Sequence, residues 1–595
     1  MRYWIVLCSF FLIFALILPV YSHKASPVCM NIHIKKVQSV GRTWDDVSLL
    51  YPNKFHNSSE IMEEIANIET VVPMLVDVSV IGQSFLEKDI QLIRITNEAN
   101  QDPKAGVFFV AQHHAREKIT VEIALRFIQH LLNNYGVDET LTNYIDTEEI
   151  YIIPTLNPDG NDVVVDEGNE WLRKNTRPFD DDGDGEFDED PIEDVDGDGK
   201  IYAFEVYEKP TPTWDLIESG FNAYPIETVI EGIDNDGDGL VNEDVIGFVD
   251  LNRNYDCYWN DSSFTSGWGS DPTVEDYPGT TPFSEPETVV LRDFALQHKF
   301  AAAMSLHSGI NETYFPVYSN NYYTEPSLYY QLYLNLRAIL PNRFIHSGIN
   351  KDIATSTAGD WSLWMYEEAG CKVPMTFEIY NNASSLENDI CYFLISDNET
   401  HQIWKWTGMY EYFSPTESAT NFENLWFDIF PAFDYWLEIT PRLQITIKSV
   451  KFTGFDVGDV VTLEVDIENL SPSLNTIEMI DFLNGDYEVL RRNGIPVKTI
   501  AIFPESSQSK TIEFELDQSI TETSFILMVG NDYTGYQHIV LESGETTQYT
   551  TLSLSTSTRI SQTSSRISGN TPGFILSSIL IILPLFTILR GRRKN

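Results

Sequence analysis

Three residues at two places in the sequence have the types and spacing to hold a metal ion. His114 and Glu117 lie three residues apart directly after an apolar run, so a single turn of chain presents both side chains on the same side. A catalytic zinc ion takes three protein ligands and keeps a fourth position open. His307, at the end of another apolar run, is placed to be the third ligand. Together these residues could hold one catalytic zinc ion that activates water and polarises a carbonyl group. A single histidine at a strand end is more often structural, so both interpretations stay open at this point.

A second group of residues with metal-binding chemistry is acidic. Segments 180–190 and 234–244 are near copies, with Asp on alternate residues followed by glycine, and a loop from Asp194 adds Glu205 at its twelfth position, as in an EF-hand. Ca²⁺ takes six to eight oxygen ligands, and the glycine lets the chain wrap around the ion. A purely solvated acidic run is the alternative, but it does not require the spacing to recur three times. The predicted ligands of structural calcium are Asp194, Asp196, Asp198, Lys200, Glu205, Asp180, Asp182, Asp184, Asp234, Asp236 and Asp238.

The elements that must position the zinc candidates have the composition of buried strands and helices. Residues 107–111, 149–153 and 301–306 are continuous apolar runs, and 119–133 has apolar residues at helical spacing. The alternation of such segments over residues 43–437 predicts an α/β domain whose central sheet is covered by helices on both faces.

The pattern of the chain changes after Pro441. Residues 443–450, 460–468 and 511–516 alternate apolar and polar side chains, with turn residues between them. We expect an all-β, immunoglobulin-like sandwich over residues 441–545, serving as a spacer or an interaction module.

Seven short motifs occur in one order within residues 43–436. They are His114-x-x-Glu117, Asn157-Pro158-Asp159-Gly160, Trp171-Leu172-Arg173-Lys174, Gly247-Phe248-Val249-Asp250-Leu251-Asn252-Arg253-Asn254, Pro282-Phe283-Ser284-Glu285-Pro286-Glu287, His307 and Thr376-Phe377-Glu378. This series resembles the zinc carboxypeptidases of the carboxypeptidase A type. The resemblance implies a mixed central sheet, and it makes the acidic segment 180–244 an insertion between the third and fourth motifs.

The resemblance also implies a role for individual residues. His114, Glu117 and His307 match the zinc ligands of the family. Glu378 matches the general base, which takes a proton from water and passes it to the leaving amine. Arg173 matches the residue that stabilises the developing oxyanion.

Three further residues match those that bind substrate in the family. Asn252 and Arg253 match the pair that holds the terminal carboxylate, which a guanidinium binds through two parallel hydrogen bonds. Arg116 matches a further substrate-binding arginine. The implied activity is hydrolysis of the C-terminal peptide bond of peptides or proteins.

One position departs from the family pattern, and the residue that sets substrate specificity is not fixed by the motifs. Thr355 stands where the family usually has a mobile tyrosine, so we expect altered substrate affinity with activity retained. The specificity position falls near Ser362, where no acid is present, which argues against a preference for basic C-terminal residues.

Both ends of the chain have the composition of targeting segments. Residues 1–23 are typical of a secretory signal peptide. The apolar segment 573–590 is followed by basic residues, which predicts a transmembrane anchor, and its start resembles an archaeal sorting signal with a Pro-Gly-Phe tripeptide. The Ser/Thr-rich segment 546–572 is a linker. We expect a secreted protein at the cell surface, anchored to the membrane by its C-terminus with the catalytic domain outside.

Composition limits the possible partners. The 595-residue chain has 89 acidic and 38 basic residues, a net charge of −51, which repels polyanions and excludes nucleic acid as a partner. Beyond the predicted signal peptide, Cys29, Cys257, Cys371 and Cys391 allow three disulfide pairings, and the sequence does not choose among them. The oligomeric state is equally open.

Two other functions fit the same motifs. One is a catalytically altered surface binding or adhesion protein, which would be expected to lack a zinc ligand or the base, whereas this chain has all of them. The other is a hydrolase of modified amino acids or cell-wall peptides, whose substrate would still need a free carboxylate for Asn252 and Arg253.

Overall fold

The computed structural model describes residues 41–553 with several gaps. The predicted signal peptide and C-terminal apolar segment lie outside the described residues, as do Asp182 and Thr355. Within the described part of the chain, no helix is long and apolar enough to cross a membrane. The gaps are 102–103, 181–182, 209–224, 265, 311–312, 317–325, 341–356, 383–391, 408, 453–457, 470–474, 484–488, 491–497, 503–505, 516–523, 532–534 and 543–548.

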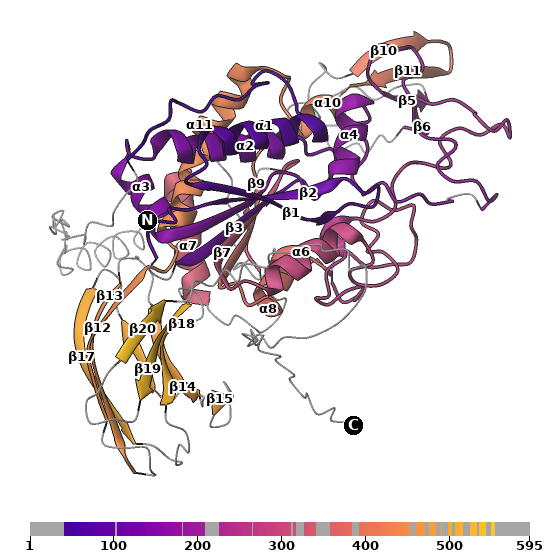
Figure 1. Ribbon diagram of the computed structural model, residues 1–595. Coiled ribbons are helices and arrows are strands. Elements are labelled where there is room, and N and C mark those ends of the chain that lie inside the picture. The colour runs from indigo at the N-terminus through magenta and orange to yellow at the C-terminus, as the bar shows by residue number, and fades with distance from the viewer. Residues whose placement is uncertain are drawn as a thin grey trace, which may run out of the picture. The chain divides into compact units, whose positions relative to one another are not determined.

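A mixed sheet of seven strands forms the centre of the α/β part, in the order β1-β2-β4-β3-β7-β9-β8 (Figure 1). Strands β4, β3, β7 and β9 run parallel, whereas β1, β2 and β8 join antiparallel at the two edges. The predicted fold class is therefore confirmed for this part. The strands are β1 (Val76–Gln83), β2 (Asp89–Ile95), β3 (Ala105–Ala111), β4 (Glu148–Ile153), β7 (Phe300–His307), β8 (Thr313–Tyr314) and β9 (Val373–Glu378).

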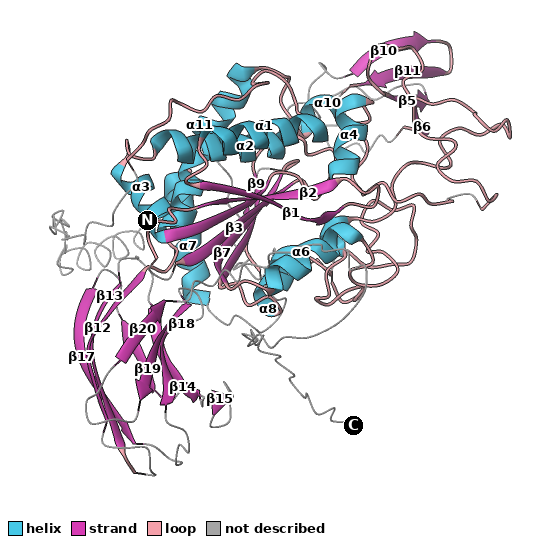
Figure 2. Cartoon of the chain, in the orientation of Figure 1, coloured by secondary structure: helices cyan, strands magenta, loops and turns pink. Residues whose placement is uncertain are grey.

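Helices cover both faces of this sheet. Successive side chains of a strand point to opposite faces, so a strand that is apolar throughout needs a core on each face. Val107 and Phe109 of β3 pack in one core with α1, α2, α3, α7 and α11, while Phe108 and Val110 pack in a second core with α6 and α8. Figure 2 shows α1 and α2 on one side of the sheet and α6 on the other. The helices are α1 (Ser58–Val71), α2 (Ile119–Asn134), α3 (Glu139–Thr147), α4 (Pro158–Asp166), α6 (Pro286–Leu296), α7 (Pro326–Ile339), α8 (Trp361–Glu367), α10 (Met409–Tyr412), α11 (Ala419–Glu438) and the short 3₁₀ helix η1 (Leu251–Arg253).

A smaller sheet of four strands brings the acidic insertion against a later part of the chain. Its order is β10-β11-β5-β6, so β5 of the insertion pairs with β11. The strands are β5 (Ala203–Glu208), β6 (Glu227–Ile230), β10 (Tyr392–Asp397) and β11 (His401–Trp406).

The described elements after Pro441 are all strands, in two antiparallel sheets. One sheet has the order β12-β13-β17, and the other has the order β15-β14-β18-β19-β20 with β16 paired to β14. The immunoglobulin-like arrangement of this part stays a prediction. The strands are β12 (Leu443–Phe452), β13 (Val460–Asn469), β14 (Asn475–Leu483), β15 (Val489–Leu490), β16 (Lys498–Ile502), β17 (Ser506–Glu515), β18 (Ser524–Asn531), β19 (Gly535–Glu542) and β20 (Tyr549–Ser553).

A buried polar cluster joins the start of α1 to α2. The imidazole of His56 lies 2.8 Å from Glu122 and 3.2 Å from Glu64, and all three residues are at most 1% exposed. Burial alone would lower the pKa of His56, but its hydrogen bonds to Glu122 and Glu64 outweigh burial and raise the pKa to about 9. The folded protein therefore keeps a proton on His56 at neutral pH.

This cluster predicts a pH-dependent stability. The stabilisation by protonated His56 is fully present below its unfolded pKa near 6.5 and is lost as the pH rises through about 9. We expect the free energy of unfolding to fall by about 2 kcal/mol more between pH 6.5 and pH 9 in the native chain than in the His56→Gln variant. Denaturant unfolding of both proteins across this range measures the difference, and parallel curves would contradict the assignment.

Candidate metal centre

The ends of three parallel strands bring the predicted catalytic residues to one edge of the sheet. The chain leaves β3 at Ala111 and enters the segment that contains His114 and Glu117. His307 is the last residue of β7 and Glu378 the last residue of β9, and the parallel register places these two directly opposite each other. Since β3 pairs with β7, both groups of predicted residues meet at the same edge.

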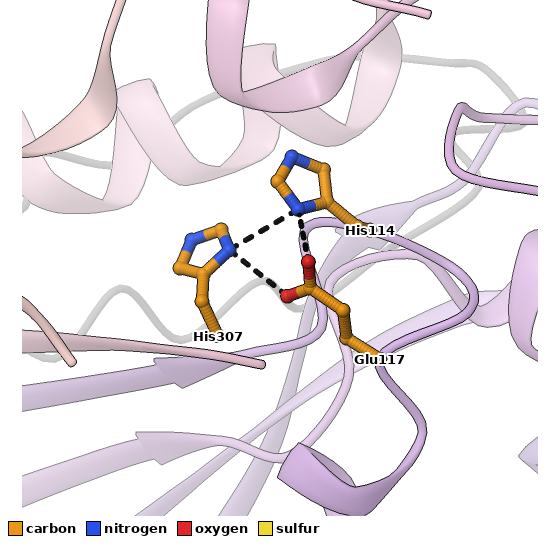
Figure 3. A group of neighbouring side chains, drawn as sticks. All are labelled: His114, Glu117 and His307. Carbon is orange, nitrogen blue, oxygen red and sulfur yellow. Dashed lines mark hydrogen bonds and ion pairs between the residues drawn. The ribbon is translucent and has the colours of Figure 1, made fainter. Parts of the chain in front are cut away.

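Figure 3 shows the three predicted zinc ligands converging on one point. Nδ1 of His114 lies 2.7 Å from Oε1 of Glu117, and Nδ1 of His307 lies 3.0 Å from Oε2 of the same carboxylate. The two Nδ1 atoms are 3.2 Å apart. All three residues are buried, with at most 3% of their surface exposed.

This arrangement fits a zinc ion. Ligands about 2.0–2.1 Å from a tetrahedral ion lie roughly 3.3 Å from one another, close to the separations observed. The protonation states fit as well: burial lowers the pKa of His307, which favours the neutral imidazole that a metal requires. Burial alone would raise the pKa of Glu117, but His114 and His307 lower it instead, so its carboxylate is ionised.

Asp250 connects the metal ligands to the predicted oxyanion residue. Its Oδ1 lies 3.1 Å from Nε2 of His114, and its Oδ2 accepts a 2.9 Å hydrogen bond from Nε of Arg173. Asp250 is completely buried, and burial alone would raise its pKa, but Arg173, Arg253 and His114 hold the pKa well below its usual range. The sequence prediction gave this residue no role, although it stands two positions before Asn252 in the fourth motif.

The predicted substrate-binding pair lies next to this network. The side-chain oxygen of Asn252 accepts a 3.0 Å hydrogen bond from the backbone N–H of Trp361, at the start of α8. The guanidinium of Arg253 donates to the carbonyl of Asn252. Gly359 contacts Arg253 so closely that a Cβ atom there would lie 1.9 Å from the Arg253 carbonyl oxygen, and its φ of +66° also favours glycine.

Arg116 has a different environment from the one expected of a residue open to substrate. Its two terminal nitrogens lie 2.8 and 3.1 Å from the two carboxylate oxygens of Glu275, and its guanidinium stacks 4.3 Å above the ring of Phe413. A substrate carboxylate would have to displace Glu275 to bind Arg116. Ser362, near the predicted specificity position, is buried and donates its hydroxyl to Asp360.

His113 is a buried neighbour of the site that sequence analysis did not single out. Its ring stacks on His307 with centroids 5.3 Å apart, and its nitrogens lie 3.0 Å from the Tyr255 hydroxyl and 3.1 Å from the Ser305 hydroxyl. No local signal in the sequence marked this histidine, because its partners Tyr255 and Ser305 are distant along the chain.

The acidic loops fold as glycine-punctuated turns of one kind. In each, the first aspartate accepts hydrogen bonds from the backbone N–H groups of the glycines that follow: Asp180 from Gly183 and Gly185, Asp194 from Gly197 and Gly199, and Asp234 from Gly237 and Gly239. Asp234, Asp236 and Asp238 present carboxylate oxygens within 4.8 Å of one another.

The middle loop differs from its prediction at the twelfth position. Among the described residues, Asp194 and Asp196 are joined by Glu231 from beyond β6. Glu205 does not lie in this group: it belongs to β5 and accepts a hydrogen bond from Tyr207. The expected ligand is misplaced because the chain after this loop forms a strand, whereas an EF-hand continues into a helix. Lys200 stacks on the ring of Tyr410.

Two of the four cysteines considered for disulfides lie within the described residues. Cys257 and Cys371 are buried free thiols in the core that contains α6 and α8. Burial raises the pKa of both thiols. A disulfide between these two is therefore absent, and Cys29 and Cys391 lie outside the described residues.

The position of Asp250 predicts its effect on metal binding. Asp250→Asn removes the charge that orients His114 and pairs with Arg173, while keeping the shape of the side chain. Because groups behind a metal ligand typically contribute 10- to 100-fold to affinity, we expect about tenfold weaker zinc binding. Competition with a chromophoric chelator measures this change, with Asp256→Asn as the control at a neighbouring aspartate. Equal zinc affinities of the native chain and Asp250→Asn would contradict the role.

Comparisons with known proteins show what the chain is similar to. It is 35% identical over 127 residues to a zinc carboxypeptidase of Saccharothrix mutabilis subsp. capreolus, an alignment that covers 21% of this chain and 29% of that protein. It is 30% identical over 127 residues to the inactive metallocarboxypeptidase ECM14 of Saccharomyces cerevisiae, covering 21% of this chain and 30% of the relative. The chain thus matches less than a third of the length of these relatives.

Two further matches extend over more of the chain. The crystal structure of thrombin activatable fibrinolysis inhibitor aligns with 66% of this chain and 76% of that chain, at 20% identity and a TM-score of 0.44. The sequence profile of the Peptidase M14 family, described as zinc carboxypeptidase, matches residues 61–407, which is more than half of the chain. The chain therefore belongs to the zinc carboxypeptidase family.

Proposed function

We propose that this protein is an active metallocarboxypeptidase that removes the C-terminal residue of peptides or proteins outside the cell. The observation that carries the proposal is the convergence of His114, Glu117 and His307 directly beside Glu378. Two imidazoles and one carboxylate are the donor set of a catalytic zinc site with an open position.

The residues of the site divide the chemistry of peptide hydrolysis among them. Zinc, when bound by His114, Glu117 and His307, supplies a Lewis acid for the scissile carbonyl and lowers the pKa of water. Glu378 takes the proton of the attacking water and delivers it to the leaving nitrogen, so the amine departs neutral. Arg173, held by Asp250 at 2.9 Å, offers its remaining N–H groups to the oxygen that becomes negative.

Recognition of a chain terminus falls to Asn252 and Arg253. Both belong to η1, whose conformation is fixed by Asp250: its side chain accepts the backbone N–H of Asn252, and its carbonyl accepts that of Arg253. A guanidinium held here binds a free carboxylate through paired hydrogen bonds, and an internal peptide bond offers no such group. This requirement makes the enzyme an exopeptidase.

We propose as well that the loops beginning at Asp180, Asp194 and Asp234 bind structural calcium. The three loops share one turn geometry. Two clusters of neighbouring carboxylates, one containing Asp194 and the other Asp234, also support this proposal. The secreted, membrane-anchored location belongs to the same proposal and rests on the sequence of the two ends of the chain. Extracellular calcium is abundant enough for weak structural sites of this kind.

The relative ECM14 is by its name an inactive metallocarboxypeptidase, which suggests a non-catalytic function as the second candidate. A chain of this fold without activity would serve as a surface binding protein. The complete set of His114, Glu117, His307 and Glu378 favours catalysis. Hydrolysis of modified amino acids or cell-wall peptides differs from the main proposal only in the substrate.

The role of Glu378 predicts a separation of metal binding from catalysis. Glu378→Gln keeps the size of the side chain but cannot accept the proton, so we expect kcat to fall by about 10³-fold while one zinc ion per chain is retained. Peptide hydrolysis and metal content are measured on the same sample. Substantial hydrolysis by the variant would show that another group is the base.

The role of Arg253 predicts a strict requirement for a free terminal carboxylate. We expect a peptide to be hydrolysed and its C-terminal amide to be left intact. The Arg253→Ala variant should lose about 10²-fold in kcat/KM on the free peptide, because a charged hydrogen-bonded pair is worth about 3 kcal/mol. Equal cleavage of the peptide and its amide would contradict the exopeptidase assignment.

A further inference from the structure

The two repeats of the acidic insertion meet at their last residues. Asp190 ends the first repeat and Asp244 ends the second, and the two form an isolated antiparallel bridge. They are 1% and 0% exposed, so two carboxylates are buried in a part of the chain that is otherwise largely exposed. Burying a carboxylate is costly unless it is compensated by a cation or by hydrogen bonds.

The side chain of Asp190 lies among residues of the other repeat. Its Oδ1 accepts a 2.6 Å hydrogen bond from the backbone N–H of Asn235. Its Oδ2 is buried and accepts no hydrogen bond from any described residue. The carboxylate has an oxygen within 4.8 Å of carboxylate oxygens of both Asp236 and Glu243. Asp236 also belongs to the group formed with Asp234 and Asp238.

This group is negatively charged without a basic partner. No lysine, arginine or histidine of the described residues forms an ion pair with Asp190, Asp236 or Glu243. Among the described residues, the group at this junction therefore has no positively charged partner, and a divalent cation would supply one.

We propose that Asp190 of the first repeat completes a calcium site in the second repeat, together with Asp236 and Glu243, so that one ion fastens the two repeats to each other. An all-oxygen set of carboxylates favours a hard cation such as Ca²⁺ over zinc. This inference rests on the calcium binding proposed above and deepens it, because the ligand comes from the partner repeat and not from the loop that surrounds the ion.

The junction is connected to the metal centre through the base of the insertion. There the backbone N–H of Asn175 donates to the carbonyl of Val249, and the backbone N–H of Phe248 donates to the carbonyl of Asn175. The side-chain oxygen of Asn175 accepts a hydrogen bond from the backbone N–H of Val249. Arg173 and Asp250 stand immediately outside this pairing. An ion that fastens the repeats therefore stabilises the ends of the insertion from which these two residues emerge.

Calcium titration of the full chain tests the inference. After calcium is removed and zinc is restored, calorimetry with Ca²⁺ compares the native chain with Asp190→Asn and with Glu186→Gln. Glu186 is an exposed residue of the same repeat and belongs to none of the carboxylate groups, so its variant removes the same charge without removing a proposed ligand. We expect Asp190→Asn to lose one ion or about tenfold in affinity at one site, and Glu186→Gln to bind like the native chain.

The alternative results separate the proposals. If the native chain binds calcium and Asp190→Asn binds it equally well, the inter-repeat site is wrong while calcium binding stands. If the native chain binds no calcium, both calcium proposals are wrong, and the peptidase proposal is judged separately by hydrolysis.

Thermal unfolding distinguishes a ligand from a residue that only supports the fold. Without calcium, Asp190→Asn and Glu243→Gln should melt at or above the temperature of the native chain, because each removes one of several neighbouring negative charges. With calcium, the native chain should melt higher than both variants, since only its complete site binds the ion tightly. Lower melting of both variants without calcium would overturn the inference.

Discussion

The carboxylate of Glu117, buried between two imidazoles, is the constraint on which the rest of the catalytic domain depends. An ionised carboxylate is costly inside a protein unless positive charge or hydrogen bonds compensate it. Here Nδ1 of His114 lies against one oxygen and Nδ1 of His307 against the other, and a zinc ion bound by all three residues would supply the positive charge. His114 follows the end of β3 and His307 ends β7, so the site exists only where the ends of these paired strands meet. The parallel sheet is therefore what makes the metal site possible.

Asp250 extends this constraint from the metal to the substrate. Its two oxygens contact His114 and Arg173, and it also fixes the backbone of the short helix that carries Asn252 and Arg253. One buried aspartate thus sets the positions of His114, of Arg173, and of the short helix with Asn252 and Arg253, to which we assign metal binding, oxyanion stabilisation and carboxylate recognition. These shared contacts bring residues that are distant in the sequence into one site. The acidic insertion, residues 180–244, lies in the sequence between Arg173 and Asp250.

The α/β part and the meeting of His114, Glu117 and His307 were predictable from the sequence, because local signals mark the strands and the motifs. Continuous apolar runs predicted the buried strands, and one of these runs placed His307 at a strand end. Choices between distant partners were not predictable. Glu231 and not Glu205 lies beside Asp194 and Asp196, since Glu205 belongs to β5, and Arg116 pairs with Glu275 from 159 positions away. No local pattern could reveal that Asp190 reaches the other repeat.

Zinc-dependent removal of C-terminal residues is tested most directly by the products that the purified full chain releases from a mixed peptide library. Mass spectrometry would follow the library with zinc present, after zinc is chelated, and after zinc is restored. We expect loss of single C-terminal residues, abolished by the chelator and recovered with zinc, and no internal cleavage. Folded protein with zinc bound that leaves every peptide intact, or cuts within peptides, would contradict it.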